Sequence, residues 1–353
     1  MPTKYYSIIS NNKLFGYAFE IKRIFEPVLL NSKYVIKIIL SNNQQLESYV
    51  NYDFTKLGLI KIYKLFDVNT IKHLINKGAD FQCDNDYFFR LVCNYGHTDI
   101  ARLLIDYGTN IKAVNNHAIR SASRNGHLEM VKLLIDNGAD ICANNNVSII
   151  LASENGHLDL VKLLIDNGAD ICSNNNASIA SASENGHLDL VKLLMNNGAD
   201  IYANDNETIR LACIKGHFEI IKLLINSGVN PNVVGLVNVA SEHGHTNIVK
   251  LLIEQGANFT DNDNYAIRIA VLNNHIDVVK LLINSGADIT VKNNYALRKA
   301  SKHGHLDMVK LLINSGVDVT AKNNYALRKA YLYNHEDIVQ LLIDAGLDIV
   351  DKN

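Results

Sequence analysis

The chain of 353 residues contains no tryptophan, only three prolines and no apolar run long enough to cross a membrane. A membrane-spanning helix needs about 18 or more consecutive apolar residues, so we expect no membrane partner. The opening residues, MPTKYYSIISNNK, also lack the apolar stretch of a secretory signal. These absences indicate a reducing compartment, and we expect the protein to be cytoplasmic.

Cysteine is scarce as well. The cysteines are odd in number and form no CxxC pair, so we expect neither a disulfide framework nor a bound metal. In a reducing compartment a cysteine behaves as a small apolar residue, and we expect these side chains to fill core positions. The five are Cys83, Cys93, Cys142, Cys172 and Cys213.

Neither sign of charge dominates the sequence. Lys and Arg number 34 and Asp and Glu number 36, which gives a formal net charge of −2. A nearly neutral chain carries no general signal for nucleic acid or for an anionic membrane, so we expect no nucleic-acid partner. Apolar residues make up 48% of the chain, which is enough to build a packed core.

What the sequence does contain is a repeat. The string GHLDLVKLLIDNGADI begins at Gly156, and close copies begin at five other glycines. The repeat length is 30 residues, with one step of 28 between Gly228 and Gly256. One glycine recurs in phase along the chain at Gly78, Gly108, Gly138, Gly168, Gly198, Gly228, Gly256, Gly286, Gly316 and Gly346.

Each repeat has the pattern of two helices. In LEMVKLLIDNG the apolar residues form a wide stripe, Glu129 lies in the first turn, and Gly138 follows the last turn. The preceding helix, in HAIRSASRNG, is shorter and ends at Gly126. An Asn-rich loop tolerates the left-handed turns that join one repeat to the next. By the same stripe we expect Leu163 to be buried between repeats.

No repeat can bury its apolar faces alone, so neighbours must stack into one continuous core. The phrase GHLDLVKLLIDNGAD is similar to the most recognisable part of the ankyrin repeat, and the match extends over about residues 57–350. The predicted fold is therefore all-α, an ankyrin-like helix-turn-helix solenoid with shortened finger loops. The expected repeats are 57–86, 87–116, 117–146, 147–176, 177–206, 207–234, 235–264, 265–294, 295–324 and 325–353.

The resemblance has two departures. These repeats have 30 residues where ankyrin repeats usually have about 33, and the Thr-Pro-Leu-His opening becomes, for example, Tyr-Ala-Leu-Arg at 295–298. The missing residues fall in the β-turn finger, so we expect no two-stranded hairpins at 141–146, 171–176, 289–294 or 319–324. Shortened Asn-rich repeats resemble those of giant DNA viruses of amoebae, which would make the compartment the host cytoplasm.

Two segments break the pattern. Residues 1–56 contain no clean repeat, yet 36–43 mimics the VKLLIDNG phrase of a second helix, and 14–30 could be the helix before it. We interpret 1–56 as a degenerate capping region, with a small separate module as the alternative. At 228–237 the step shortens and Pro231 replaces the Asn run, so we expect a local irregularity.

The repeated polar residues do not form a catalytic or metal site. Packed helices lie about 8–10 Å apart, so equivalent histidines in neighbouring repeats cannot share a zinc ion. We expect each His to bond backbone groups of a neighbouring repeat, and we expect no cofactor and no enzyme activity. A recurring arginine either forms a basic stripe or bonds loop carbonyls or the Asp of the GAD turn in a neighbouring repeat. It occurs at Arg90, Arg120, Arg210, Arg268, Arg298 and Arg328.

Variation among the repeats marks positions that stacking leaves free. The two residues before each Gly-His or Asn-His pair and the finger tips vary most, and the resemblance places this end of the first helix on the concave face. We expect a partner to contact Tyr87, Tyr95, Arg124, Asn125, Glu154, Asn155, Glu184, Asn185, Glu207, Lys215, Glu242, His243, Lys302 and His303.

These positions are acidic in the middle of the array and basic in its last third. The basic residues are Lys292, Lys299, Lys302, Lys322 and Lys329. The surface would select a partner with complementary charge blocks. The alternative is surface drift without function.

Two functions remain open at this point. One is a monomeric, non-enzymatic scaffold that binds a protein partner through the concave face. The other is a substrate-recognition adaptor whose N-terminal region recruits a ubiquitin ligase or another enzyme complex. Ankyrin proteins of poxvirus type resemble the adaptor, but they carry an F-box-like C-terminus, and this sequence stops at Asn353 just after a repeat.

Overall fold

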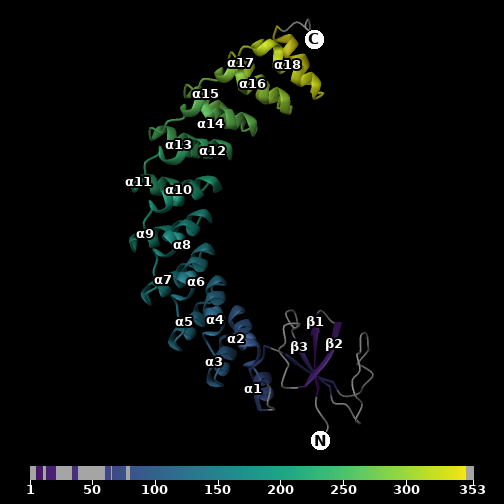
Figure 1. Cartoon of the computed structure of the whole chain (residues 1–353), viewed down its shortest axis with the longest axis vertical. Helices are drawn as coiled ribbons and strands as arrows, with labels where there is room; N and C mark the ends of the chain where they lie inside the picture. The colour runs from purple at the N-terminus through teal and green to yellow at the C-terminus, as the bar shows by residue number, and fades with distance from the viewer. Residues whose placement is uncertain are drawn as a thin grey trace. The chain divides into compact units, whose positions relative to one another are not determined.

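The structure, a computed structural model, describes residues 5–10, 13–20, 34–38, 60–64, 66–76 and 80–346. The chain divides into two compact units, Met1–Asn174 and Asn175–Asn353, and each is described by itself. In both units, every described element from Val68 onward is a helix (Figure 1). The predicted all-α fold class is therefore confirmed for the repeats.

The N-terminal segment of the first unit contains strands. An antiparallel sheet has the order β2-β1-β3-β4. Its strands are β1 Tyr5–Ser10, β2 Lys13–Glu20, β3 Tyr34–Ile38 and β4 Ile60–Lys64. The helices expected within 14–30 and 36–43 are thus wrong where β2 and β3 overlap them. Segments such as YVIKI are short and rich in β-branched and aromatic residues, which favours strands over helices.

The helices alternate along the chain, and in each repeat we call the two members the first and the second helix. The first unit contains α1 Val68–Asn76, α2 Cys83–Asn94, α3 Thr98–Asp106, α4 Ala113–Arg124, α5 Leu128–Asp136, α6 Ala143–Glu154 and α7 Leu158–Asp166. From α2 onward the even-numbered helices are first helices, and the odd-numbered helices are second helices.

The second unit continues the alternation. It contains α8 Ser173–Glu184, α9 Leu188–Asn196, α10 Ala203–Lys215, α11 Phe218–Asn226, α12 Leu236–Glu242, α13 Thr246–Glu254, α14 Asp261–Leu272, α15 Ile276–Asn284, α16 Val291–His303, α17 Leu306–Asn314, α18 Ala321–Leu332 and α19 Glu336–Asp344. The first two residues of α8 fall on the other side of the division at Asn174.

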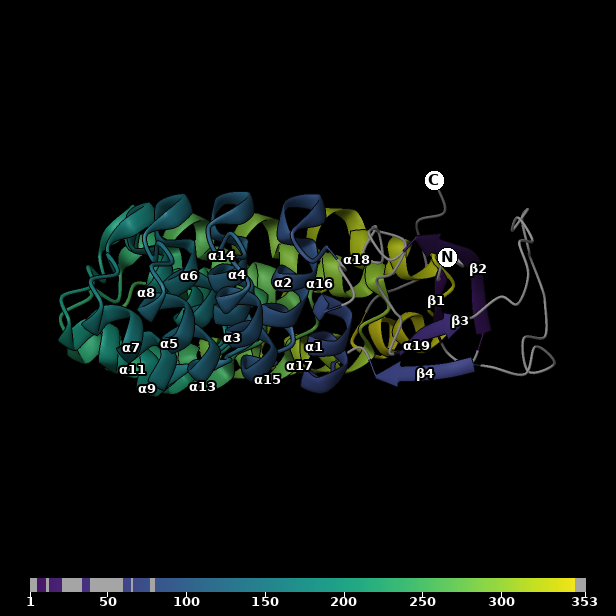
Figure 2. The same ribbon diagram turned by 90° about the horizontal axis from the view of Figure 1, so that it is seen from below.

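Within each unit, helices of one kind pack against their own kind. In the first unit α2 contacts α4 and α4 contacts α6, while α3 contacts α5 and α5 contacts α7. In the second unit α12, α14, α16 and α18 follow one another in the same way. The first helices of each unit therefore form one layer and its second helices another, as Figure 2 shows.

The core lies between these layers. In α7 the side chains of Leu160, Val161 and Leu164 are buried, and Leu164 is fully inaccessible. Leu163, which the stripe placed in the core, is only half-buried, so that prediction is wrong. The stripe is wide enough to include a residue at its edge, and the pattern alone does not separate edge from centre.

A left-handed turn takes the place of the ankyrin finger. At the start of α6, Asn144, Asn145 and Asn146 have φ angles of 55°, 57° and 56°. Asn tolerates this region better than most residues with a Cβ, because its short side chain bonds locally. The described residues at 141–146, 171–176, 289–294 and 319–324 form no hairpin strands, which confirms that prediction.

The shortened repeat is irregular where the sequence predicted. A 3₁₀ turn at Val233–Gly235 replaces the three-residue left-handed turn, and only Gly235 has a positive φ there. The helix that follows, α12, has 7 residues, whereas most first helices have 12. The predicted local irregularity is therefore confirmed.

Candidate partner-binding surface

The recurring asparagine that ends each left-handed turn holds the next repeat. The side-chain Oδ1 of Asn146 accepts a hydrogen bond of 2.9 Å from the backbone N–H of Asp170. Asn116, Asn176 and Asn264 do the same for the residues 24 positions later. These asparagines are buried, so the repeated residue is used in stacking and is not offered to a partner.

The recurring arginine closes its own turn. Arg298 donates from Nε to the carbonyl of Asn293 and from Nη2 to the carbonyl of Lys292, each at 3.0 Å. Arg90, Arg120, Arg268 and Arg328 make bonds of the same kind. Guanidinium suits such multidentate bonding. Of the two readings of this arginine, donation to loop carbonyls is therefore the one observed at these positions.

The recurring histidine joins neighbouring repeats. Nε2 of His127 lies 2.9 Å from the carbonyl oxygen of Asn94 in the preceding repeat. Equivalent bonds of 2.8–3.3 Å hold His157, His217, His245, His275, His305 and His335. Because the carbonyl can only accept, Nε2 carries the proton and donates it. The predicted structural role of these histidines is confirmed.

The glycine that precedes the histidine in most repeats makes room for the histidine of the next repeat. At Gly126, φ is +73°, and an added Cβ would lie 2.5 Å from the ring of His157. A residue with a side chain would have to adopt the left-handed region and displace that ring. The Gly-His phrase of the repeat is thus explained by packing.

Because these recurring residues are used within the stack, the surface that remains available to a partner lies on the first helices. After each left-handed turn, positions 1, 5 and 8 of the first helix share one face, because they are spaced by four and three residues. We call these three positions the first-helix stripe. In α16 the stripe is Tyr295, Lys299 and Lys302, which are half-buried, while Ala296, Leu297, Ala300 and Ser301 between them are buried.

The structure places the residues predicted to contact a partner on or beside this stripe. Tyr87, Arg124, Glu154, Glu184, Glu207, Glu242 and Lys302 occupy stripe positions. Tyr95, Asn125, Asn155, Asn185, Lys215, His243 and His303 follow the last stripe position of their own repeats. Tyr87, Glu184, Glu207 and Lys302 are half-buried, and the other ten are exposed.

Some predicted residues also make structural bonds. The side-chain nitrogen of Asn125 donates to the carbonyls of Asn94 and Ser121, each at 3.0 Å. Asn155 and Asn185 donate at 2.8 Å and 2.9 Å to the carbonyl four residues earlier. These asparagines cap their helices, so their role in binding stays a prediction.

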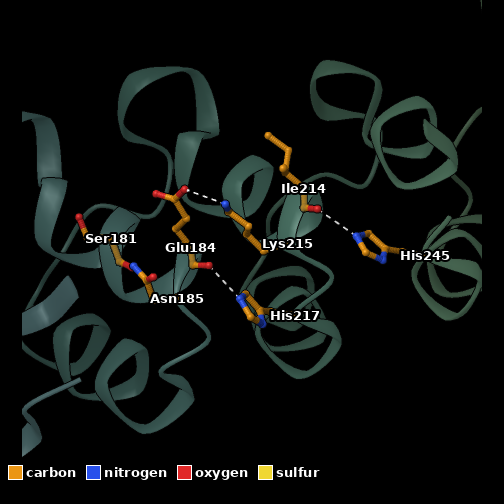
Figure 3. A network of polar contacts seen from close by, with 7 residues as sticks. All are labelled: Ser181, Glu184, Asn185, Ile214, Lys215, His217 and His245. Atoms are coloured by element: carbon orange, nitrogen blue, oxygen red, sulfur yellow. Dashed lines mark hydrogen bonds and ion pairs between the residues drawn. The ribbon is translucent and has the colours of Figure 1, made fainter. Parts of the chain in front are cut away.

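The middle of the array contains an ion pair between repeats. Nζ of Lys215 on α10 lies 3.5 Å from Oε1 of Glu184 on α8. The backbone carbonyl of Glu184 accepts the hydrogen bond from His217 (Figure 3). The backbone of Glu184 therefore joins two repeats, while its side chain forms the ion pair on the surface. Both side chains of the pair are more than one-third exposed, which leaves them accessible to a partner.

The first unit carries aromatic side chains on this surface. The ring of Tyr95 meets Phe66 edge-on with centroids 5.7 Å apart, and Phe66 stacks on His97 at 4.3 Å. Tyr95 is 51% exposed even so. The guanidinium of Arg90 lies 5.4 Å from the ring centre of Tyr87. The surface at α2 therefore presents aromatic side chains.

The last three described repeats carry a ladder of alternating tyrosines and arginines. Arg268 lies 5.3 Å from the ring centres of both Tyr265 and Tyr295. Arg298 lies 5.9 Å from that of Tyr295 and 5.1 Å from that of Tyr325. Each arginine is also held by its loop carbonyls, so the ladder is a fixed part of the surface.

Lysines lie beside this ladder. Nζ of Lys299 is 5.3 Å from the ring centre of Tyr295, and Nζ of Lys302 is 5.6 Å from that of Tyr333. Partial burial lowers the pKa of His303 below its ordinary value. Repulsion from His305, Lys302 and Lys299 lowers this pKa further, which is the behaviour of a site where positive charge is concentrated.

Other chemistry is sparse among the described residues. They include no group of three or more His, Cys, Asp and Glu side chains that could hold a metal ion. No described helix has both the length and the apolar character needed to span a membrane. Cys93 and Cys213 are buried free thiols, as predicted, and burial raises the pKa of Cys213 to about 12. Cys142 and Cys172 are exposed, so their prediction as core residues is wrong, while the side chain of Cys83 lies outside the described residues.

The predicted contact residues did not include the middle position of the stripe, although Lys299 and Lys329 were counted among the basic residues of the last third. That position holds Leu151, Leu211, Val239, Ile269, Lys299 and Lys329 in different repeats, all half-buried. The missed signal was the spacing of four residues from the tip of each turn, which puts the tip and this position on one face. Leu332 and Tyr333, the pair before Asn334-His335, follow the variable pattern of the sequence, and both are exposed at the end of α18.

The comparison with protein families agrees with this architecture. A family model described as ankyrin repeats (3 copies) matches residues 61–145, 146–205, 209–293 and 290–353. Together these matches cover most of the chain. No curated protein matches it.

Proposed function

Because the chain belongs to the ankyrin repeat family, we propose that it is a non-catalytic scaffold that binds a partner protein through the first-helix stripe and the residues that follow it. Ankyrin repeats are generally protein–protein interaction modules. By resemblance to the family, this stripe would line the concave face of the array. The partner would read the sequence of side chains along successive first helices.

One observation supports this proposal above the others. The residues that recur in the repeats are used inside the stack: His on a carbonyl, Asn on a backbone N–H and Arg on loop carbonyls. Most stripe positions are accessible, and their chemistry changes from repeat to repeat, from Leu151 and Glu154 in α6 to Lys299 and Lys302 in α16. A surface that varies on a constant framework is what selective recognition of a protein requires.

The test is a scan of the full-length protein against a partner isolated by affinity purification. Stripe residues of α4, α8, α10 and α16 would be reversed in charge one helix at a time, with Lys132, Lys162, Lys192 and Lys280 on the second helices reversed as matched controls. We expect at least one stripe variant to weaken partner binding while thermal melting stays unchanged. If all stripe variants bind as the controls do, the proposed surface is wrong.

The adaptor function has one observation in its favour. Residues 5–64 contain an antiparallel sheet where a capping repeat would contain helices, which is more typical of a separate module. In that case the N-terminal region would recruit an enzyme complex, and the repeats would hold its substrate. Deleting residues 1–56 should then abolish capture of the enzyme complex and leave partner binding by the repeats intact, whereas loss of both would contradict the adaptor.

A further inference from the structure

The first helices α14, α16 and α18 differ in charge from the four first helices that precede them, α6, α8, α10 and α12, each of which has a Glu on its stripe. From the tip of the turn to the end of the stripe region, residues 265–273, 295–303 and 325–333 contain no Asp or Glu. The same three segments contain six basic residues: Arg268, Arg298, Lys299, Lys302, Arg328 and Lys329. We call these three segments the basic stripe region.

The lysines of this region have no acidic partner within the described part of the chain. Lys299, Lys302 and Lys329 form no ion pair there, whereas Lys280 and Lys310 on the second helices lie 3.6 Å and 3.5 Å from Asp277 and Asp307. Lys292, next to the region, is already paired with Asp263 at 3.0 Å. Three ammonium groups are therefore held on a fixed surface without a carboxylate to neutralise them.

Apolar side chains flank these ammonium groups. On α14 the middle and last stripe positions are Ile269 and Leu272, both half-buried. On α18, Leu332 is 62% exposed and Tyr333 is 46% exposed. A ligand that reached from α14 to α18 would therefore meet apolar, basic and again apolar surface in succession.

The tyrosine rings argue against single-stranded nucleic acid as the ligand. Such ligands bind by stacking bases on open aromatic faces. Here Tyr295 carries Arg268, Arg298 and Lys299 within 5.9 Å of its ring centre, and Tyr325 carries Arg298, Arg328 and Lys329. The faces on which bases would stack are occupied by the chain's own cations.

From this arrangement we infer that the basic stripe region binds an acidic polypeptide segment that also carries apolar side chains. The carboxylates of the segment would pair with Lys299, Lys302 and Lys329. Its apolar side chains would pack against Ile269 and Leu272 on one side and Leu332 and Tyr333 on the other. The inference rests on the proposed scaffold function and adds the chemistry of the partner.

The experiment measures fluorescence anisotropy with the full-length protein and a fluorescein-labelled peptide of alternating Glu and Leu. Companion probes are a Glu/Ser peptide, a Lys/Leu peptide and an oligothymidylate. We expect the Glu/Leu peptide to bind most tightly, with an affinity that falls as salt increases. Tighter binding of the oligothymidylate or of the Lys/Leu peptide would overturn the inference.

Two variants locate the binding site. Lys299→Glu with Lys302→Glu should weaken binding of the Glu/Leu peptide by about tenfold or more, since this removes two attractive charges and adds two repulsive ones. The matched control, Lys280→Glu with Lys310→Glu, changes the net charge equally and should change the affinity less than about twofold. Equal losses in both variants would show general charge attraction and would also overturn the inference.

A third variant tests the apolar part. Leu332→Ser should weaken the Glu/Leu peptide and leave the Glu/Ser peptide unchanged, and a loss that is equal for both peptides would contradict an apolar contact. Failure of the inference is distinguishable from failure of the scaffold function. If only the inference fails, binding of a protein partner still depends on stripe residues of other first helices. If the scaffold function fails, no stripe residue on any first helix affects binding of a protein partner.

Discussion

The first helices α8, α10 and α12 and the first helices α14, α16 and α18 lie in one unit, apart from the first two residues of α8, yet the two groups differ in the charge of their surface. Both groups receive a histidine bond from the next repeat, for example His217 on the carbonyl of Glu184 and His335 on that of Lys302. In the first group the stripe includes Glu184, Glu207 and Glu242, whereas the second group has no acidic residue on the stripe.

This difference separates two kinds of constraint on the sequence. Glu184 and Lys302 occupy equivalent positions, and in both cases the stack uses only the backbone carbonyl. The side chain can therefore change sign without altering the bond that joins the repeats. An array built in this way can vary its ligand chemistry repeat by repeat while its framework stays constant.

The largest expected effect is loss of the shared core. Leu224 on α11 and Leu282 on α15 are fully inaccessible, and Leu→Ala at either position should lower the free energy of unfolding by about 2–5 kcal/mol. Chemical denaturation measures this. If one of the two losses falls inside this range and the other falls outside it, the two groups do not share one framework, and the comparison fails.

Substitution of the glycine before a repeat's histidine should give the next largest loss of stability. Gly244 has φ +75°, and an added Cβ would lie 2.5 Å from the ring of His275, so Gly244→Ala should cost about 1–3 kcal/mol. The second group already holds Asn274 at the equivalent position with φ 62°, and His305 there has the longest of the described histidine bonds, 3.3 Å. Asn274→Gly should change stability by less than about 0.5 kcal/mol. An equal loss in both variants would show that close approach of the ring is not the reason for glycine.

The ion pair of the middle group should matter little for folding. Glu184 and Lys215 are more than one-third exposed, so Lys215→Ala should lower stability by less than about 1 kcal/mol. Thermal melting at low and high salt measures this. A larger loss would mean that the pair is part of the framework and that the sign of the surface is not free to change.

The smallest effect concerns the electrostatics of the last group. The pKa of His303 is lowered by partial burial and by nearby cations that include Lys302 and Lys299. Lys302→Glu replaces one of these cations with an anion, so the pKa of His303 should rise, as followed by NMR titration. Lys310→Glu, on the second helix α17, is the control and should leave it nearly unchanged. No rise in the Lys302 variant would contradict the concentration of positive charge described for this surface.

Much of the framework was predictable from the sequence because it repeats. The period of 30 residues identified the helix pairs, and geometry alone excluded shared metal sites for the histidines and led to their bonding role. The run of three left-handed residues was only partly foreseen, since the Asn-rich loop indicated tolerance for such turns and not three in succession.

The misses have physical reasons. Residues 36–43 resemble the sequence of a second helix, but 36–38, the described part of this segment, belong to β3 and pair with β1 and β4. Leu163 and Leu164 are identical in sequence, and only packing separates the half-buried residue from the buried one. The predicted contact residues gave the first or the last position of the stripe in most repeats, whereas its middle position was identified from the sequence only at Lys299 and Lys329.

The most direct test of the account exchanges the two surfaces on the shared framework. In one full-length variant, Ser181→Lys and Glu184→Lys would give α8 the basic stripe positions of α16, and Lys299→Ser and Lys302→Glu would give α16 those of α8. A Glu/Leu peptide with a photo-crosslinker would report its binding site by mass spectrometry. We predict unchanged thermal melting and crosslinks that move from α16 to α8. Crosslinks that remain on α16, or an array that no longer folds, would contradict the separation of framework from binding surface.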